Sequence, residues 1–133
     1  MRRHTPLVEI HRSILGAKMV DFHGWEMPVQ YAAGIVEEHH SVRNRIGMFD
    51  VSHMGEIAVR GADAPAFLDW VCTNEIISMK NGAVRYSPIC YPNGGTVDDL
   101  LVYRYAEDSF LLVVNASNTA KDYEWLLSGN PWL

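Results

Sequence analysis

The feature that most constrains this chain is the run from Asn93 to Tyr103, which reads Asn-Gly-Gly-Thr-Val-Asp-Asp-Leu-Leu-Val-Tyr. The Asn and Gly residues predict a turn, and the apolar residues after them predict a strand that opens with two adjacent carboxylates. Successive side chains of a strand point to opposite faces of the sheet, so Asp98 and Asp99 must face opposite sides. We expect Asp99 to share a buried or cleft-lining face with Val97, Leu101, Tyr103 and Tyr105.

A carboxylate on such a face must be paired, hydrogen-bonded or functional, because burying it unpaired is costly. Asp99 lies among aromatic residues, where a carboxylate can accept or steer a proton at a ligand nitrogen. Taken by itself, Asp99 is explained equally well by a structural role beside the turn and by a catalytic one, and its aromatic surroundings favour the catalytic role. We expect Asp98 to be structural and to accept backbone N–H bonds near the Gly94-Gly95 turn.

Helices and strands mix along the 133 residues, and three strands follow one another late in the chain with hairpin-length links. This order predicts an α+β fold, mainly an antiparallel sheet flanked by helices, in a single domain over 1–133. Apolar spacing and turn residues predict helices over 5–15, 33–46, 64–71 and 118–127, with Thr5 capping the first. They predict strands over 18–22, 48–51, 56–59, 83–91, 96–105 and 109–114, an irregular connection over 24–28 and a loop over 74–82.

Composition excludes several classes of function. The formal charge of −5 and the scattered basic residues argue against nucleic acid as a partner. Cys72 and Cys90 lack the spacing of a metal or redox motif and are expected to be buried free thiols in a reducing compartment. The N-terminus lacks the apolar core of a signal peptide, and no apolar stretch reaches membrane-spanning length. We therefore expect a soluble, cytoplasmic protein with no membrane partner.

Motifs for dinucleotides, nucleoside phosphates and zinc hydrolysis are absent from the sequence. His39 and His40 are adjacent on a predicted helix and diverge by roughly 100°, so they cannot easily share an ion. His53 is more simply explained by a surface or capping role. We expect no metal site.

Motifs that cover essentially the whole chain stand in an order and at a spacing typical of one family. These segments are Gly16–Phe22, Gly24–Pro28, Glu37–His39, Val42-Arg43, Gly47–Glu56, Thr73-Asn74, Tyr86-Ser87, Gly94–Tyr103, Val114–Asn118, Lys121-Asp122 and Trp125. Together they resemble the T protein family of the glycine cleavage system. His23 departs from the pattern, because the family usually has a small residue there.

The resemblance implies an aminomethyltransferase with the folate-binding fold of the T protein. In that family, tetrahydrofolate collects the methylene of an aminomethyl group carried on the lipoyl arm of H protein, and ammonia leaves. The family's key aspartate falls on Asp99, beside the pterin-side nitrogens of folate. The resemblance also implies a folate-pocket lining of Met54, Tyr86, Leu101 or Val102, and Tyr103, with Asn115 and Asn118 supporting that wall. Helix capping explains the two asparagines equally well.

Members of that family are far longer than 133 residues, so we expect an N-terminal fragment with an incomplete folate-binding domain. The ending at Gly129–Leu133, with two large apolar residues after a helix, is typical of a chain cut from a longer one. We expect the fragment alone to be inactive and to bind tetrahydrofolate weakly or not at all. Two alternatives are a related folate-dependent demethylase and a non-catalytic interaction module with the folate-binding fold.

Overall fold

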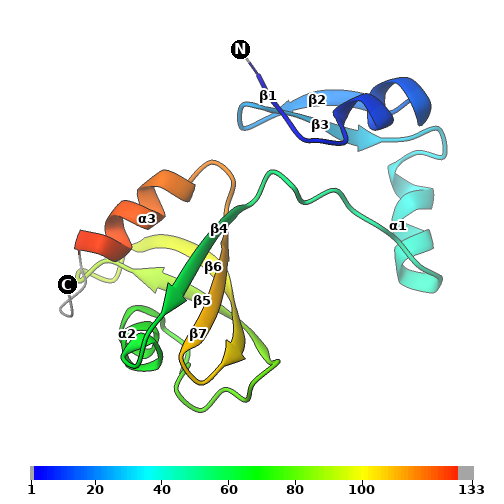
Figure 1. The fold of residues 1–133 in the computed structure, drawn as a ribbon. Helices are drawn as coiled ribbons and strands as arrows, with labels where there is room; N and C mark the ends of the chain where they lie inside the picture. The colour runs from blue at the N-terminus through cyan, green and yellow to red at the C-terminus, as the bar shows by residue number, and fades with distance from the viewer. Residues whose placement is uncertain (1, 129–133) are drawn as a thin grey trace. The chain divides into compact units, whose positions relative to one another are not determined.

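The chain folds as two compact units, Met1–His53 and Met54–Leu133. Our computed structural model describes residues 2–128, and Figure 1 shows one sheet in each unit. The expected α+β fold class is confirmed, with mainly antiparallel sheets accompanied by helices. The two terminal apolar residues noted in the sequence, Trp132 and Leu133, lie outside the described residues.

The first unit is built on a three-stranded sheet in the order β1-β3-β2. Strand β3 pairs in parallel with β1 and antiparallel with β2. The elements of this unit are β1 (Arg3–His4), the short π-helix η1 (Ile10–Ile14), β2 (Lys18–Phe22), β3 (Trp25–Gln30) and α1 (Ile35–Asn44).

Strand β3 replaces the irregular connection expected over 24–28. Phe22 pairs with Trp25, so only His23 and Gly24 form the loop between β2 and β3. Both loop residues have positive φ, 52° at His23 and 85° at Gly24. This backbone matches the twist of two-residue hairpins, where Gly is strongly favoured. The His-Gly pair between two alternating segments is therefore the signal that would have predicted the hairpin.

The strand predicted over 48–51 is wrong, because the described chain has no strand between α1 and Gly55. Asp50 instead ties this segment to the start of the chain. Its Oδ2 accepts hydrogen bonds from the Thr5 hydroxyl at 2.6 Å and from His11 Nε2 at 2.9 Å. The hydroxyl of Tyr31 lies 2.8 Å from His11 Nδ1. Thr5 thus bonds to Asp50 rather than capping the first helix.

The second unit is a four-stranded antiparallel sheet in the order β4-β7-β6-β5, with two helices packed on one face. The meander and the two helices expected in this part of the chain are confirmed, with small shifts of their ends. Its elements are β4 (Gly55–Arg60), α2 (Ala64–Val71), β5 (Val84–Cys90), β6 (Thr96–Ala106), β7 (Ser109–Val114) and α3 (Thr119–Ser128).

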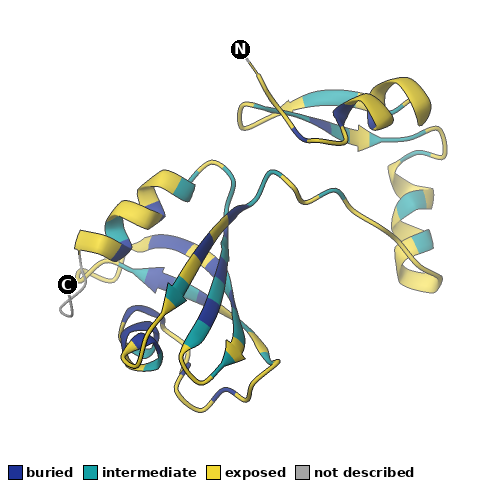
Figure 2. Cartoon of the chain, viewed as in Figure 1, coloured by how far each residue is buried: buried dark blue, intermediate teal, exposed yellow. Residues whose placement is uncertain are grey.

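One hydrophobic core lies between this sheet and the helices α2 and α3, and Figure 2 shows it as buried segments on these elements. The loop between α2 and β5 also contributes to the core through Ile76 and Met79. Both cysteines are free. Cys72 is buried, which raises its pKa to about 11, whereas Cys90 is only half-buried. The fully buried apolar side chains are Leu68, Ile76, Ile89, Val102, Phe110, Leu112 and Val114.

Candidate functional site

Strand β6 separates the two adjacent carboxylates as predicted, but with the opposite burial. Asp98 is 6% exposed and lies on the core face with Leu100 and Val102. Asp99 is exposed on the other face, which neither α2 nor α3 covers. The expectation that Asp99 lies on a buried face is therefore wrong. Asp99 shares the open face with Leu101 and Tyr103, as expected, whereas Val97 is buried in the core.

A change of register at the start of β6 explains the error. Ile89 pairs with Asp98, but the next residue, Cys90, pairs with Thr96, so β6 has one extra residue at this point. Such an insertion breaks the strict alternation of faces. Val97 and Asp98 are consequently both buried, although they are neighbours. Val97 was a misleading guide to the face of Asp99.

The open face of the sheet carries Asp99 at one end and apolar or aromatic side chains beyond it. Pairing between strands places Leu101 between Tyr86 on β5 and Val113 on β7. The next row aligns Tyr103 with Val84 and Leu111 in the same way. Residues opposite or diagonal on one face lie within side-chain reach. Asp99 therefore adjoins a surface of rings and aliphatic groups.

Asp99 is held by an amide and interacts with a phenol. Asn115 Nδ2 lies 3.2 Å from Asp99 Oδ1 and 3.3 Å from its backbone oxygen. Tyr86 is diagonal to Asp99 across β5 and β6. Desolvation raises the pKa of the Tyr86 phenol, and the charge and hydrogen bond of Asp99 raise it further. The phenol consequently stays protonated and can donate hydrogen bonds near neutral pH.

The other residues expected at the site divide between the two faces. Leu101 and Tyr103 are half-buried on the open face with Asp99, and Tyr86 is exposed there. Met54 is half-buried and directly precedes β4. Val102 is fully buried in the core on the opposite face, so of the pair Leu101 and Val102 only Leu101 adjoins Asp99.

Asp98 is structural, as expected, but its donors are not those of the Gly94-Gly95 turn. Its carboxylate accepts hydrogen bonds from Asn115 Nδ2 at 2.9 Å and Asn118 Nδ2 at 3.1 Å. Burial alone would raise its pKa, but hydrogen bonds from Asp122, Asn115, Asn118 and the Asp99 backbone outweigh burial and lower the pKa. Asp98 is therefore an anion held under helix α3.

Asp122 on α3 completes the cluster formed by Asp98, Asn115 and Asn118. Its role was not predicted from the sequence. Its side chain is fully buried, and burial together with the hydrogen bond and charge of Asp98 raises its pKa to about 7. The signal was its spacing, because Asp122 stands four residues before the buried Leu126 and hence on the same helix face. A carboxyl on the buried stripe of a helix requires a partner.

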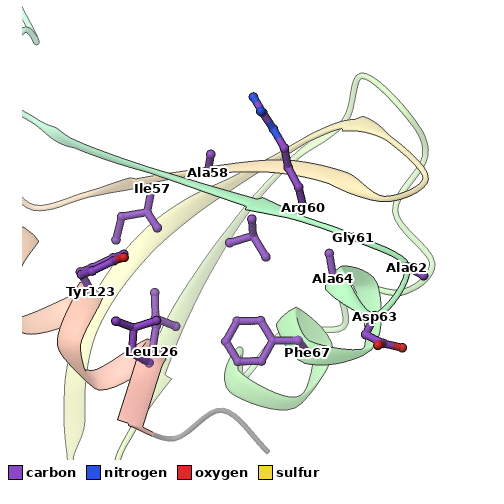
Figure 3. A pocket seen from close by; sticks show the side chains of 12 residues that line it. Ile57, Ala58, Arg60, Gly61, Ala62, Asp63, Ala64, Phe67, Tyr123 and Leu126 are labelled. Carbon is purple, nitrogen blue, oxygen red and sulfur yellow. The ribbon is translucent and has the colours of Figure 1, made fainter. Parts of the chain in front are cut away.

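A separate groove lies between β4, α2 and α3, shown in Figure 3, with a volume of about 360 Å³. Its walls are mainly apolar and none of the expected site residues lines it. The lining residues are Ile57, Ala58, Val59, Arg60, Gly61, Ala62, Asp63, Ala64, Phe67, Tyr123, Leu126 and Leu127.

Two further features concern residues 2–128, the part of the chain that the structure describes. In that part of the chain, no group of three or more His, Cys, Asp or Glu side chains is arranged to hold a metal ion. None of the helices there combines the length and the hydropathy needed to cross a membrane.

Comparisons with known proteins agree on one family. Residues 7–131 match the model of the GCVT N-terminal domain. Over 124 residues the chain is 56% identical to an aminomethyltransferase of Desulfitobacterium hafniense (strain DSM 10664 / DCB-2), covering 93% of this chain and 33% of that protein. An aminomethyltransferase of Bacillus cytotoxicus is 54% identical over 126 residues, covering 95% of this chain and 34% of its own length.

A solved structure extends the likeness to three dimensions. The glycine cleavage system aminomethyltransferase T of Bartonella henselae superposes with a TM-score of 0.89 at 39% identity. The match covers 96% of this chain and 35% of that one. The chain spans about a third of the length of the curated relatives that it matches.

Proposed function

The chain belongs to the family of the GCVT N-terminal domain, and from this we propose that it forms the N-terminal part of a tetrahydrofolate-dependent aminomethyltransferase of the glycine cleavage system. In this reaction, the methylene carbon of an aminomethyl group on the lipoyl arm of H protein passes to tetrahydrofolate. Ammonia leaves and the arm returns as dihydrolipoyl. H protein and tetrahydrofolate are the partners that this function requires, and cytoplasm is the compartment that we propose.

The observation that carries the proposal is the position of Asp99. Its carboxylate is exposed on a sheet face with no helix over it in the second unit, and one of its oxygens is held by Asn115. A carboxylate fixed in this way is pre-organised to receive a hydrogen bond from a ligand nitrogen. We assign Asp99 the role of positioning a folate nitrogen and handling a proton there as the carbon–nitrogen bond forms.

The neighbours of Asp99 fit a flat heteroaromatic ligand. Tyr86, Leu101 and Tyr103 present rings and aliphatic groups on the same face, where a ring system of the size of a pterin can stack. Asn115 keeps the carboxylate oriented, and the neutral phenol of Tyr86 supplies a donor beside it. Met54 is proposed as a further contact at the start of β4. Val102 is left out of the pocket, because it is buried in the core.

A chimeric enzyme tests this function. The matched third of the Desulfitobacterium hafniense aminomethyltransferase is replaced by this chain, and methylene transfer to tetrahydrofolate is measured with aminomethyl-loaded H protein. The 56% identity over the exchanged part makes a folded chimera a fair expectation. We expect transfer within about tenfold of the unaltered enzyme. A folded chimera that binds H protein and tetrahydrofolate but transfers nothing would contradict the proposed function.

The isolated chain gives a complementary test. We expect calorimetric titration with tetrahydrofolate to detect weak binding or none, because one wall supplies too few contacts to orient the ligand. Sub-micromolar binding by the monomer would show that the site is complete without any other part of the enzyme.

A further inference from the structure

A buried pair of carboxyl groups lies beneath the proposed site. Asp122 on α3 is fully buried, and Asp98 on β6 is 6% exposed. Among the described residues, no backbone or side-chain N–H group donates a hydrogen bond to either side-chain oxygen of Asp122. Lys121 Nζ lies 3.7 Å from Asp122 Oδ1, too far for a hydrogen bond, and donates instead to the Val97 carbonyl.

The surroundings decide which carboxyl of the pair carries a proton. Two adjacent buried carboxyl groups resist simultaneous ionisation, because their charges repel in a medium of low dielectric constant. Asp98 receives side-chain hydrogen bonds from Asn115 and Asn118, which stabilise its anion. Asp122 has no such donors, so its neutral form is favoured. A neutral Asp122 can donate its own O–H to Asp98.

We infer that Asp122 is a positioning residue whose protonated carboxyl donates to Asp98 and so maintains the anion that holds the Asn115 amide against Asp99. Asn115 links the two aspartates, since its Nδ2 lies 2.9 Å from Asp98 Oδ1 and 3.2 Å from Asp99 Oδ1. Under the proposed function, Asp99 is the group whose orientation matters, so this role of Asp122 rests on that function.

The proton on Asp122 gives the arrangement a pH dependence. The charged groups that face Asp122 are Asp98 on β6, which favours its protonation, and Lys121 on α3, which opposes it. Above neutral pH the proton is lost, and a second negative charge then lies beside Asp98. We expect this charge to weaken the hold of Asn115 on Asp98 and to loosen the amide that orients Asp99.

Carbon-13 NMR of the labelled chain follows the protonation of Asp122 through the chemical shift of its carboxyl carbon. We expect the Asp122 carboxyl to titrate with an apparent pKa near 7, against about 3.9 for an ordinary aspartate. The side-chain amide signals of Asn115 should shift in step with this titration. An Asp122 carboxyl that titrates near 4, or Asn115 signals that ignore the titration, would overturn the inference.

Substitution of Asp122 provides a second test. In Asp122→Asn the side-chain amide donates to Asp98 at every pH, so the Asn115 signals should stay fixed between pH 5 and 8. The unfolding constant of the wild-type chain should rise with pH relative to this variant, by at most about tenfold per unit between roughly pH 4 and 7. The sign follows because the folded chain binds the extra proton in that window.

Two comparisons complete the test. Asp108→Asn removes an exposed carboxyl from the turn between β6 and β7. In this variant the Asp122 carboxyl and the Asn115 amide signals should titrate as in the wild type. Asp122→Leu removes the donor and should displace the Asn115 signals at every pH. If the Asn115 signals and the unfolding constant depend on pH in the same way in the wild type and in Asp122→Asn, the role of Asp122 is refuted. If the chimera lacks transferase activity while Asn115 still follows Asp122, the proposed function fails and the proton link stands.

Discussion

Asp98 and Asp99 are neighbours in the chain, yet their surroundings differ. Asp98 is buried and accepts two asparagine amides, whereas Asp99 is exposed. We expect Asp98→Ala to lower the free energy of unfolding by about 2–4 kcal/mol, because it removes a buried carboxylate and leaves two half-buried amide donors unpaired. Asp99→Ala should change it by no more than about 0.5 kcal/mol. Urea unfolding of both variants measures the contrast, and similar losses would contradict the assigned faces.

At the residue scale, the sequence separates the two aspartates but does not show which one is buried. Alternation along a strand requires them to face opposite ways. The face that each aspartate takes depends on the extra residue at the start of β6 and on the cover over Asp98, which Asn118 supplies directly before α3 and Asp122 within it. Neither feature follows from local pattern. The same cover explains why Val102 is a core residue while Leu101 adjoins Asp99.

At the scale of elements, the start of β4 meets the start of α3 at Gly55. A Cβ on Gly55 would lie 2.2 Å from Thr119 Oγ1 and 2.7 Å from Val114 Cγ2. We expect Gly55→Ala to destabilise the chain by about 1–3 kcal/mol, since the site cannot accept a methyl group without movement.

Two variants control the Gly55 prediction in thermal unfolding. Gly95→Ala should cost much less, because in this exposed turn its Cβ would lie 3.2 Å from Asn93 Oδ1 and 3.7 Å from Tyr91 Cδ2, with no closer contact. Thr119→Ala combined with Gly55→Ala should recover part of the stability by removing two of the clashing atoms. A tolerated Gly55→Ala would mean that β4 and α3 approach less closely.

In the first unit, Asp50 joins the segment after α1 to the start of the chain. Burial alone would raise its pKa, but hydrogen bonds from Thr5, Ser52 and His11 outweigh burial and lower it well below the usual range. A lowered folded pKa stabilises the fold at neutral pH, and this contribution is lost as pH falls below about 4. We expect Asp50→Asn to lower the free energy of unfolding by about 1–3 kcal/mol at pH 7 and to make that free energy less dependent on pH in acid.

Amide hydrogen exchange in β1 to β3 measures this effect within the first unit. The exposed Glu37→Gln on α1 serves as the control and should leave exchange unchanged. Exchange that is the same in Asp50→Asn and the wild type at pH 7 would contradict the role of Asp50.

The elements predicted correctly are those encoded by local signals. Turn residues bound β5, β6 and β7, and apolar spacing marks α2. Strand β3 was missed although His23-Gly24 signals its hairpin with β2, because it contains Pro28, which is uncommon inside strands. The strand predicted over 48–51 has the right residue types but no partner strand. The second case depends on a partner strand elsewhere in the chain, which is not visible in a local window.

At the scale of the whole molecule, the two units differ in how much apolar surface they bury. The second unit contains a continuous core, whereas Val8 and Met27 are the buried apolar residues among the described residues of the first. The family match from residue 7 to 131 nevertheless spans both. The first unit therefore depends more on polar contacts such as those of Asp50, and the second supplies the well-packed sheet on which Asp99 is placed.

The measurement that tests the central claim most directly is the transfer rate of the chimeric enzyme with Asp99→Asn. We predict a loss of at least about 100-fold in kcat with unchanged thermal stability, because the amide cannot take up the proton. The Asp108→Asn chimera should retain its full rate. Full activity of the Asp99→Asn chimera, or a loss matched by unfolding, would contradict the role assigned to Asp99.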